Sequence, residues 1–344
     1  MVRRDGRAAP RSHPLRSLLK AATALTAAVT LAGCSLLGGS NTDEAQGNDK
    51  VEKERITIGV QPVVDLAPVH LAIKKGYFAE EGLQVELVDT PGGPQAVTDM
   101  IGGALDFAFA SHVPFFINQS QGTARLKIVV DGYAAKDNVM VLMAPPNSPV
   151  KGPQDVPGRR VAVVSEGSIS DTSVKAVLKD HGLDYNNVKW QILSFPAMMA
   201  GFNDGTFDAA LLVEPFITQA QKQFGAVKVF DAASGPNAEL SLAGYATTED
   251  FAKKYPKTVA AFQRAVLKAQ AEAADRKVVE ELVAEYTNID KETISLMNLG
   301  SFPTSVEAVR LQRVADLLLE FQLISGPVNA EEMVFRPESQ ESQQ

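Results

Sequence analysis

The sequence predicts an α/β protein with two similar lobes, each containing a mostly parallel sheet flanked by helices and hinged to the other around a cleft. The first supporting observation is a repeat: the body of the chain reads as strand–helix–strand–helix–strand twice, at an offset of about a hundred residues, too long for a solenoid. The second is that both passes contain the pattern Gly-x-x-Asp-x-Ala, at 103–108 and 205–210. The third is a helical stretch over 248–320 that has no repeat partner and is expected to pack on the first lobe.

The elements of the two passes correspond in order. The first pass opens with a strand-like run at 55–60, and Gly76 is placed to end the helix that follows. The second opens with an equivalent run at 159–164. Asp106 and Asp208 occupy the same place in the repeated pattern, and we expect each to have a structural role in its lobe.

Pro-, Gly- and Ser-rich stretches at 144–158 and 231–245 are expected to be the crossovers between lobes. We therefore expect the first lobe to comprise 55–143 plus 240–335, the second to comprise 144–239, and 336–344 to be a polar tail. In the helical stretch, Thr248 is expected to cap a helix, Pro256 to start one, and 306–324 to form an amphipathic one.

The N-terminal region is typical of an export signal. A basic segment precedes the short apolar run 21–31 and the sequence Leu-Ala-Gly-Cys, which ends at Cys34, the only cysteine. The apolar run is shorter than the 20 or so residues that span a bilayer. The motif resembles a bacterial lipobox, which implies a signal peptide at 1–33, lipidation of Cys34 and a flexible tether over 34–54.

The formal charge of −8 becomes −13 if residues 1–33 are removed, because that segment holds six basic residues and one acidic residue. So acidic a chain, without a basic run, is not expected to bind nucleic acid.

Polar side chains follow several predicted strands, at the ends where open α/β sheets bind ligands. Those of the first lobe are Gln61, Asp65, Ser111, His112 and Tyr133. In the second lobe, Gly167, Ser168 and Ser170 lie where a strand gives way to a helix, whose N–H groups suit an oxyanion or a carbonyl. Glu214 follows the next strand, and Asn237 lies near the second crossover.

Each of these residues has a structural alternative. Ser168 and Ser170 are equally consistent with helix capping. His112 alone is more typical of a hydrogen-bonded structural histidine, and with four histidines in the chain no metal site is expected. Tyr133 is the preferred aromatic ligand contact, because its polar tip suits a wet cleft. Four other aromatic residues are expected in the core: Phe115, Phe116, Phe195 and Phe216.

Several segments together resemble the solute-binding proteins of ABC importers for nitrate, sulfonates, taurine and thiamine-pyrimidine precursors. They include Lys-x-Gly-Tyr-Phe-x-x-Glu-Gly-Leu at 74–83, Gly-x-x-Asp-x-x-x-x-Ser at 103–111, and the stretches 166–168, 207–215 and 255–270. The resemblance implies a periplasmic-binding-protein type II fold, no cofactor, and a monomer that delivers a solute to a permease and ATPase at the membrane. It leaves open a sensor that passes its ligand-bound state to a membrane kinase.

An enzyme of the same fold is a third interpretation. Some members of this group are pyrimidine synthases, which an exported chain fits poorly, and some are desulfinases, whose cysteine nucleophile has no counterpart beyond Cys34.

The chain departs from the family where Gly167-Ser168-Ile169 replaces the usual Gly-Ser-Thr. The candidate loops also lack Lys and Arg, yet they contain Asp65, Asp131, Glu166, Asp171 and Glu214. Because carboxylates in a desolvated cleft need cationic or N–H partners, this composition favours an amine-bearing solute, such as an aminopyrimidine or a taurine-like zwitterion.

Overall fold

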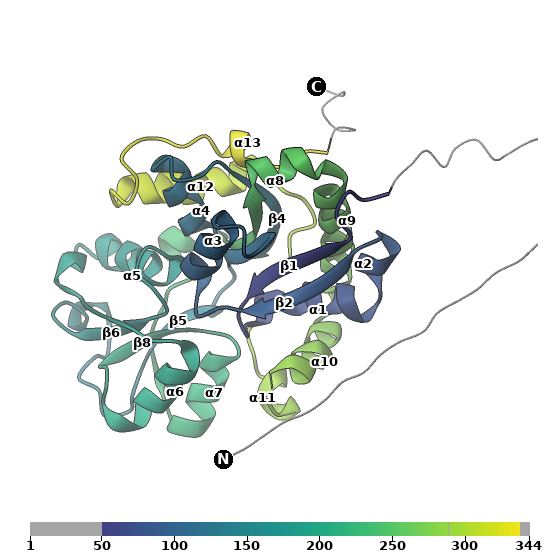
Figure 1. Cartoon of the computed structure of the whole chain (residues 1–344). Coiled ribbons are helices and arrows are strands. Elements are labelled where there is room, and N and C mark those ends of the chain that lie inside the picture. Colours follow the sequence, from purple (N-terminus) through teal and green to yellow (C-terminus); the bar gives the residue numbers. More distant parts are fainter. Residues whose placement is uncertain (1–49, 288, 338–344) are drawn as a thin grey trace, which may run out of the picture. The chain divides into compact units, whose positions relative to one another are not determined.

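The computed structural model describes residues 50–287 and 289–337, which lie in one compact unit. Cys34 and the expected signal peptide lie outside the described residues. The chain folds into two five-stranded sheets with helices on their faces, and each sheet forms the centre of one lobe (Figure 1). Within the described residues, no helix has both the length and the apolarity to span a membrane.

The sheet of the first lobe has the strand order β2-β1-β3-β10-β4. Strand β10 runs against its neighbours β3 and β4, and the other four strands share one direction. The bounds are β1 Arg55–Val60, β2 Gln84–Asp89, β3 Phe107–Ser111, β4 Leu126–Ala134 and β10 Ser241–Thr248. The helices of the first pass are η1 Val64–Leu66, α1 Ala67–Lys74, α2 Tyr77–Glu80, α3 Gly93–Ile101 and α4 His112–Ser120.

The sheet of the second lobe repeats this order as β7-β6-β8-β5-β9, with β5 as its antiparallel strand. The bounds are β5 Met140–Ala144, β6 Arg160–Val163, β7 Lys189–Ile192, β8 Ala209–Val213 and β9 Val227–Asp231. Its helices are η2 Pro153–Asp155, α5 Ile169–Asp180, η3 Tyr185–Asn187, α6 Phe195–Asp204, α7 Phe216–Phe224 and η4 Gly235–Asn237. The expected pair of mostly parallel sheets is confirmed.

The antiparallel strand of each sheet follows, in the chain, the last parallel strand of the other sheet. The chain leaves the first sheet after β4 and enters the second as β5, and it returns after β9 as β10. The crossovers are therefore 135–139 and 232–240. The second falls within the expected 231–245, but the first lies before the expected 144–158, and β5, which was expected in the first lobe, belongs to the second sheet.

Asp106 and Asp208 make equivalent hydrogen bonds to β1 in the first lobe and to β6 in the second. Asp106 accepts a hydrogen bond from the N–H of Thr57 at 2.9 Å and pairs with Lys53. Asp208 accepts from the N–H of Arg160 at 2.9 Å and from its guanidinium at 2.9 Å. The expected structural role of both residues is confirmed: each ties the start of one parallel strand to the start of its neighbour.

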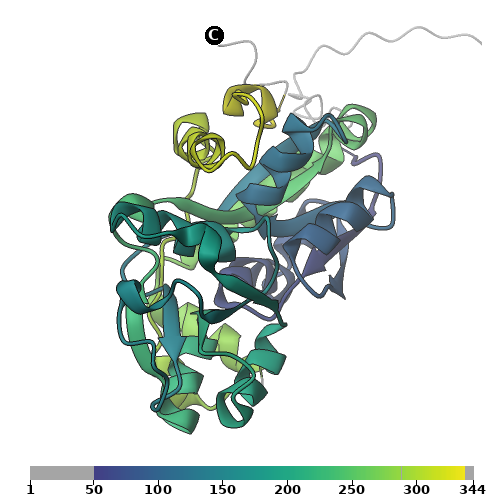
Figure 2. The ribbon, with the colours of Figure 1, turned by 90° about the vertical axis from the view of Figure 1, so that its left-hand side faces the viewer.

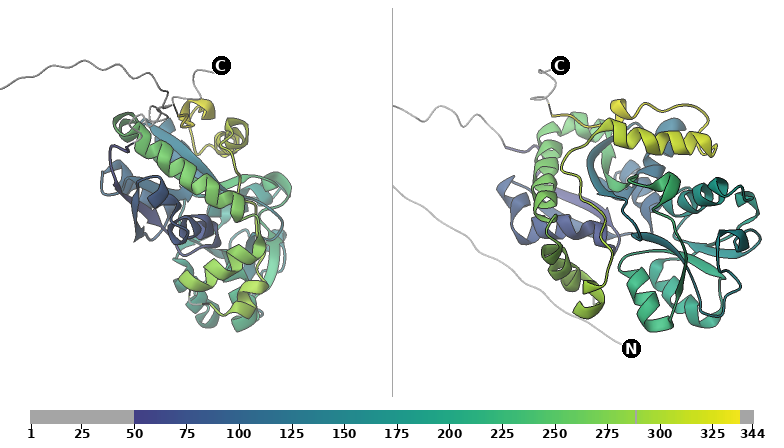
Figure 3. Two further views of the ribbon diagram at one scale, coloured as in Figure 1. Left: turned by 90° about the vertical axis from the view of Figure 1, so that its right-hand side faces the viewer. Right: turned by 180° about the vertical axis from the view of Figure 1, so that it is seen from behind.

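The C-terminal helices pack mainly on the first lobe, as expected, except that the short helix Lys291–Ser295 also contacts α7 of the second lobe (Figure 2; Figure 3). They are α8 Glu249–Lys254, α9 Pro256–Glu272, α10 Arg276–Tyr286, α11 Lys291–Ser295, α12 Ala308–Glu320 and α13 Ala330–Met333. The hydroxyl of Thr248 accepts from the N–H of Phe251 and caps α8, and Pro256 starts α9.

The outer edge of β4 is also covered by the C-terminal part of the chain. Ser301 and Ala134 exchange two backbone hydrogen bonds, and the N–H of Phe335 donates to Ile128. The side-chain amide of Gln270, on α9, donates to the carbonyls of Asp131 and Gly132. This cover removes an open strand edge, which would otherwise be free to pair with other chains.

Candidate functional site

A cavity lies between the lobes, at the carboxyl ends of β1, β3, β6 and β8, and with the solvent at its mouth it spans about 710 Å³. Its lining is mostly apolar and contains no Lys, Arg, His or Cys. The lining residues are Gln61, Val63, Asp65, Gly93, Pro94, Phe109, Ser111, Tyr133, Val139, Met140, Val164, Ser165, Ser168, Ile169, Ser170, Phe195, Leu211, Val213, Leu242 and Ala243. A concave, mostly apolar space with few polar groups is typical of a small-molecule site.

The structure brings six of the predicted site residues together around this cavity: Gln61, Asp65, Ser111, Tyr133, Ser168 and Ser170. They come from both lobes and from segments more than a hundred residues apart. The other four predicted residues, His112, Gly167, Glu214 and Asn237, do not line it.

Asp65 is the one ionisable carboxyl group in the lining. It lies in η1, directly after the turn that follows β1, and no other described side chain pairs with it. Burial raises the pKa of Asp65 to about 7, against a weaker opposing effect from its own backbone N–H. Its charge also raises the pKa values of Tyr133, Tyr245 and Tyr286, after the larger effect of their own burial. The phenol of Tyr245 is buried with no hydrogen-bond partner. Asp65 therefore has a carboxyl group without a cationic partner, close enough to Tyr133, Tyr245 and Tyr286 to influence their ionisation.

Tyr133 forms part of the wall and is 2% exposed. Its hydroxyl accepts a hydrogen bond from the N–H of Gly300 at 2.6 Å, and Phe302 packs on its ring at 5.2 Å. The backbone of residues 300–302 thus fixes the tyrosine ring at the cavity.

The N-terminus of α5 reaches the cavity, but its donors already have partners. The hydroxyl of Ser168 accepts from the N–H of Ser170, and the carboxylate of Asp171 accepts from the N–H of Ser168 at 3.0 Å, which forms a capping box. The hydroxyl of Ser111, from the first lobe, accepts from the N–H of Ile169 at 3.3 Å. In this structure Ser168 and Ser170 therefore make the contacts expected of helix-capping residues. Ser111 connects the two lobes across the cleft through its hydrogen bond with Ile169.

Some lining residues were not expected from the sequence. Phe195 was expected in the core, but it lies at the cavity while stacking on Phe216 at 4.8 Å. Gly93 begins α3, which has no side-chain cap, and a Cβ there would lie 2.9 Å from that of Ala110. The Gly-Gly-Pro sequence at 92–94 was the available signal for this close approach of a helix N-terminus to a strand end.

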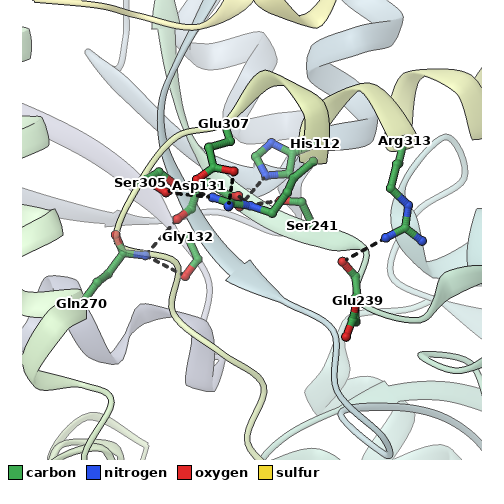
Figure 4. A network of polar contacts seen from close by, with 10 residues as sticks. His112, Asp131, Gly132, Glu239, Ser241, Gln270, Ser305, Glu307 and Arg313 are labelled. Atoms are coloured by element: carbon green, nitrogen blue, oxygen red, sulfur yellow. Dashed lines mark hydrogen bonds and ion pairs between the residues drawn. The ribbon is translucent and has the colours of Figure 1, made fainter.

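His112 belongs to a buried network of polar contacts in the first lobe (Figure 4). Its Nε2 atom lies 3.5 Å from Oδ1 of Asp131, which also accepts from the hydroxyl of Ser241. The other oxygen of Asp131 accepts from Nε of Arg310 on α12 at 3.0 Å. His112 and Asp131 are fully buried, so this network joins β4, α4, β10 and α12 inside the first lobe.

The other carboxylates that the sequence placed near the cleft are also accounted for. Asp171 pairs with Lys175 at 2.6 Å, and Glu166 is exposed and outside the lining. Glu214 is fully buried and accepts from the N–H and hydroxyl of Thr218 and from the N–H of Asn298. Burial raises the pKa of Glu214, and these hydrogen bonds oppose that rise.

Asn237 and Gly167 have local roles. The buried amide of Asn237 donates to the carbonyls of Ser173 and Ala232, which ties the second crossover to α5. Gly167 has a φ of +67°, a left-handed conformation that favours glycine in the turn before α5.

Comparison with known proteins finds one family model and several relatives that are named as binding proteins. The family model described as NMT1/THI5 like matches residues 64–277. An Escherichia coli (strain K12) protein whose name describes aliphatic sulfonate binding is 25% identical over 290 residues, which cover 81% of this chain and 87% of that protein. The taurine-binding periplasmic protein of the same organism is 23% identical over 220 residues, or 64% of this chain and 67% of that protein.

Solved structures share the fold. The alkanesulfonate-binding protein SsuA from Xanthomonas axonopodis pv. citri, bound to MOPS, superposes with a TM-score of 0.70 at 18% identity and covers 83% of this chain and 99% of its own. The family match extends over most of both lobes and includes the predicted motifs. The chain belongs to the NMT1/THI5-like family.

Proposed function

We propose that this chain is the solute-binding component of an ABC importer, which captures a small organic solute between its lobes and delivers it to a membrane permease. The relatives named for sulfonate and taurine binding support the binding role. A lining without Cys, His or Lys supports binding without chemistry on the solute, because it lacks a thiol or amine nucleophile and a histidine that could activate one of its serines.

The solute class is an amine attached to a small apolar body. The observation that carries this proposal is Asp65, a carboxyl group without a partner in a cavity that otherwise presents mainly apolar and aromatic atoms. Asp65 is half-buried, and a carboxylate drawn out of water in this way is stabilised by a counter-charge, which no described cationic side chain supplies here. A protonated amine on the solute supplies it, and Tyr133 and Phe109 offer aromatic surface beside it.

A bare oxyanion fits the site less well. The lining holds no Lys or Arg, and the N-terminal N–H groups of α5 are taken by Ser111 and Ser168. The uncapped N-terminus of α3 at Gly93 retains free donors, so an anionic group can bind there while the amine faces Asp65. A zwitterion such as taurine satisfies both ends, and an aminopyrimidine satisfies the first by donating hydrogen bonds from its amine and from a protonated ring nitrogen.

We further propose that the protein acts on the extracytoplasmic face of the membrane, held there by lipid on Cys34, as a monomer. The lipobox-like sequence before Cys34 supports the anchor. Replacing Cys34 with Ala should release the exported protein from the membrane fraction, and retention there would contradict the anchor.

The proposal is tested by thermal unfolding of the chain from residue 48 onward, the compact unit that contains the whole described core. The panel pairs taurine with ethanesulfonate, and hydroxymethylpyrimidine with its analogue in which a hydroxyl replaces the amine, and adds nitrate. A compound at about 100 times its Kd should stabilise by about 2.7 kcal/mol. We expect stabilisation by one amine-bearing member and not by its partner. Equal stabilisation within a pair, or stabilisation by nitrate alone, would contradict the assigned class.

A further inference from the structure

The segment 296–302, the first part of the connection between α11 and α12, contacts both lobes, and we refer to it as the clasp. It lies beyond the 64–277 matched by the family model. Seen from behind, the chain runs from α11 to α12 along the side turned away in Figure 1 (Figure 3, right). None of its residues lines the cavity.

One end of the clasp holds the second lobe. The N–H of Asn298 donates to Oε1 of Glu214 at 3.0 Å, and the carboxylate of Glu214 also accepts from the N–H of Thr218 at 3.1 Å. Glu214 is fully buried, so these hydrogen bonds are made away from water, where an unsatisfied carboxylate is costly. Lys222, on α7, reinforces this attachment by lying 3.5 Å from Asp290 and 3.6 Å from Glu292.

The other end holds the first lobe. The N–H of Gly300 donates to the hydroxyl of Tyr133, and Ser301 pairs with Ala134 through two backbone hydrogen bonds of 2.9 and 3.1 Å. Gly300 approaches so closely that a Cβ would lie 2.4 Å from the carbonyl oxygen of Ala134 and 2.7 Å from Cζ of Tyr133. This contact leaves no room for a side chain.

Glu214 connects the clasp to Asp65 as well. Its backbone carbonyl accepts from the N–H of Val64, the residue before Asp65, at 3.3 Å. Glu214 is therefore a junction between the end of β8 in the second lobe, η1 in the first lobe, and the clasp. Two lining residues are held close to this junction. Asp65 follows Val64, which donates to Glu214, and Tyr133 accepts from Gly300 of the clasp.

We propose that Glu214 and the clasp are positioning residues: they hold the lobes at a fixed separation and place Asp65 and Tyr133 at the cavity. The amine-recognition part of this inference rests on the proposed function, whereas the lobe-holding part does not. It also gives Glu214, which the sequence placed among the ligand contacts, a role outside the cavity.

The test compares Gly300→Ala with Gly326→Ala in the chain from residue 48 onward. Gly326 also lies in the C-terminal part of the chain, but no atom lies within 4 Å of where its Cβ would be. Nitroxide labels at Gln84→Cys and Gln223→Cys, both exposed and on different lobes, report the separation by double electron–electron resonance. The chain from residue 48 has no native cysteine to interfere.

We expect Gly300→Ala to lengthen or broaden the label distance, and to lower the affinity ratio of taurine to ethanesulfonate at least fivefold if the parent discriminates between them. Gly326→Ala should change neither. Tyr133→Phe keeps the ring but removes the acceptor for Gly300, and should change the distance in the same direction by less. An unchanged label distance in both Gly300→Ala and Tyr133→Phe would overturn the inference. A parent that does not distinguish taurine from ethanesulfonate bears on the proposed function alone, because the distance measurement needs no solute.

Discussion

Asp65 combines three properties that rarely occur together in a structural residue. It lies in η1, just beyond the carboxyl end of β1, it lines a cavity, and its carboxyl group has no ionic partner among the described side chains. Its raised pKa means that the folded state disfavours the charged form, so the unliganded protein carries an energetic cost that a cationic solute would remove.

This cost predicts a pH dependence of stability. Because the folded-state pKa is raised to about 7 from 3.8, the folded state binds more protons than the unfolded state between these values. The free energy of unfolding should therefore fall as pH rises from about 4 to about 7 through this group. Asp65→Asn should flatten that part of the profile in urea titrations, and Glu86→Gln, an exposed carboxylate on β2, should not. Parallel profiles for the parent and Asp65→Asn would contradict the assignment.

The sequence predicted part of the site because strand ends can be read locally. Gln61, Asp65, Ser111 and Tyr133 each follow or end a strand, and all four reach the cavity. His112 does not, because neighbouring side chains at a strand end point in different directions, and that of His112 turns inward to Asp131. Glu214 does not, because Asn298, 84 residues away in sequence, binds its carboxylate. Partners so distant leave no local signal.

At the scale of elements, the repeated aspartates were predictable and the antiparallel strands were not. Asp106 and Asp208 stand out because the same spacing recurs, and they make equivalent contacts with β1 and β6. Strand β5 is a short apolar run, Met-Val-Leu-Met-Ala. Its composition does not predict in which direction the strand runs or which of the two sheets it joins. Its place depends on pairing with β8 and β9, which are formed some seventy residues later.

The hydrogen bonds of Asp208 predict how its replacement changes the free energy of unfolding. Asp208→Ala removes the acceptor for the N–H and guanidinium of Arg160 and should lower the free energy of unfolding by about 1–3 kcal/mol. Asp204→Ala removes only a local contact with Thr206 in an exposed turn and serves as the control, with an expected loss of about 0.5 kcal/mol. Urea unfolding measures both. Equal losses would show that Asp208 contributes no more than a surface turn.

At the scale of the whole compact unit, the site exists only when the lobes meet. Asp65 and Tyr133 come from the first lobe, Ser168 and Phe195 come from the second, and the hydroxyl of Ser111 accepts a hydrogen bond from the N–H of Ile169 across the cleft. Because the walls come from both lobes, a solute that touches both gains affinity only from the arrangement in which the lobes meet. The unpaired carboxyl of Asp65 is the contact that most clearly needs a solute to complete it.

The most direct test of this account is isothermal titration of taurine and ethanesulfonate, and of the two pyrimidines, into the parent chain and Asp65→Asn at pH 8, where Asp65 is ionised. We expect one amine-bearing compound to bind the parent at least tenfold more tightly than its analogue without the amine. Asp65→Asn should abolish this preference, and Glu86→Gln should preserve it. A preference for the amine that survives in Asp65→Asn, or tighter binding of the compounds without an amine, would contradict it.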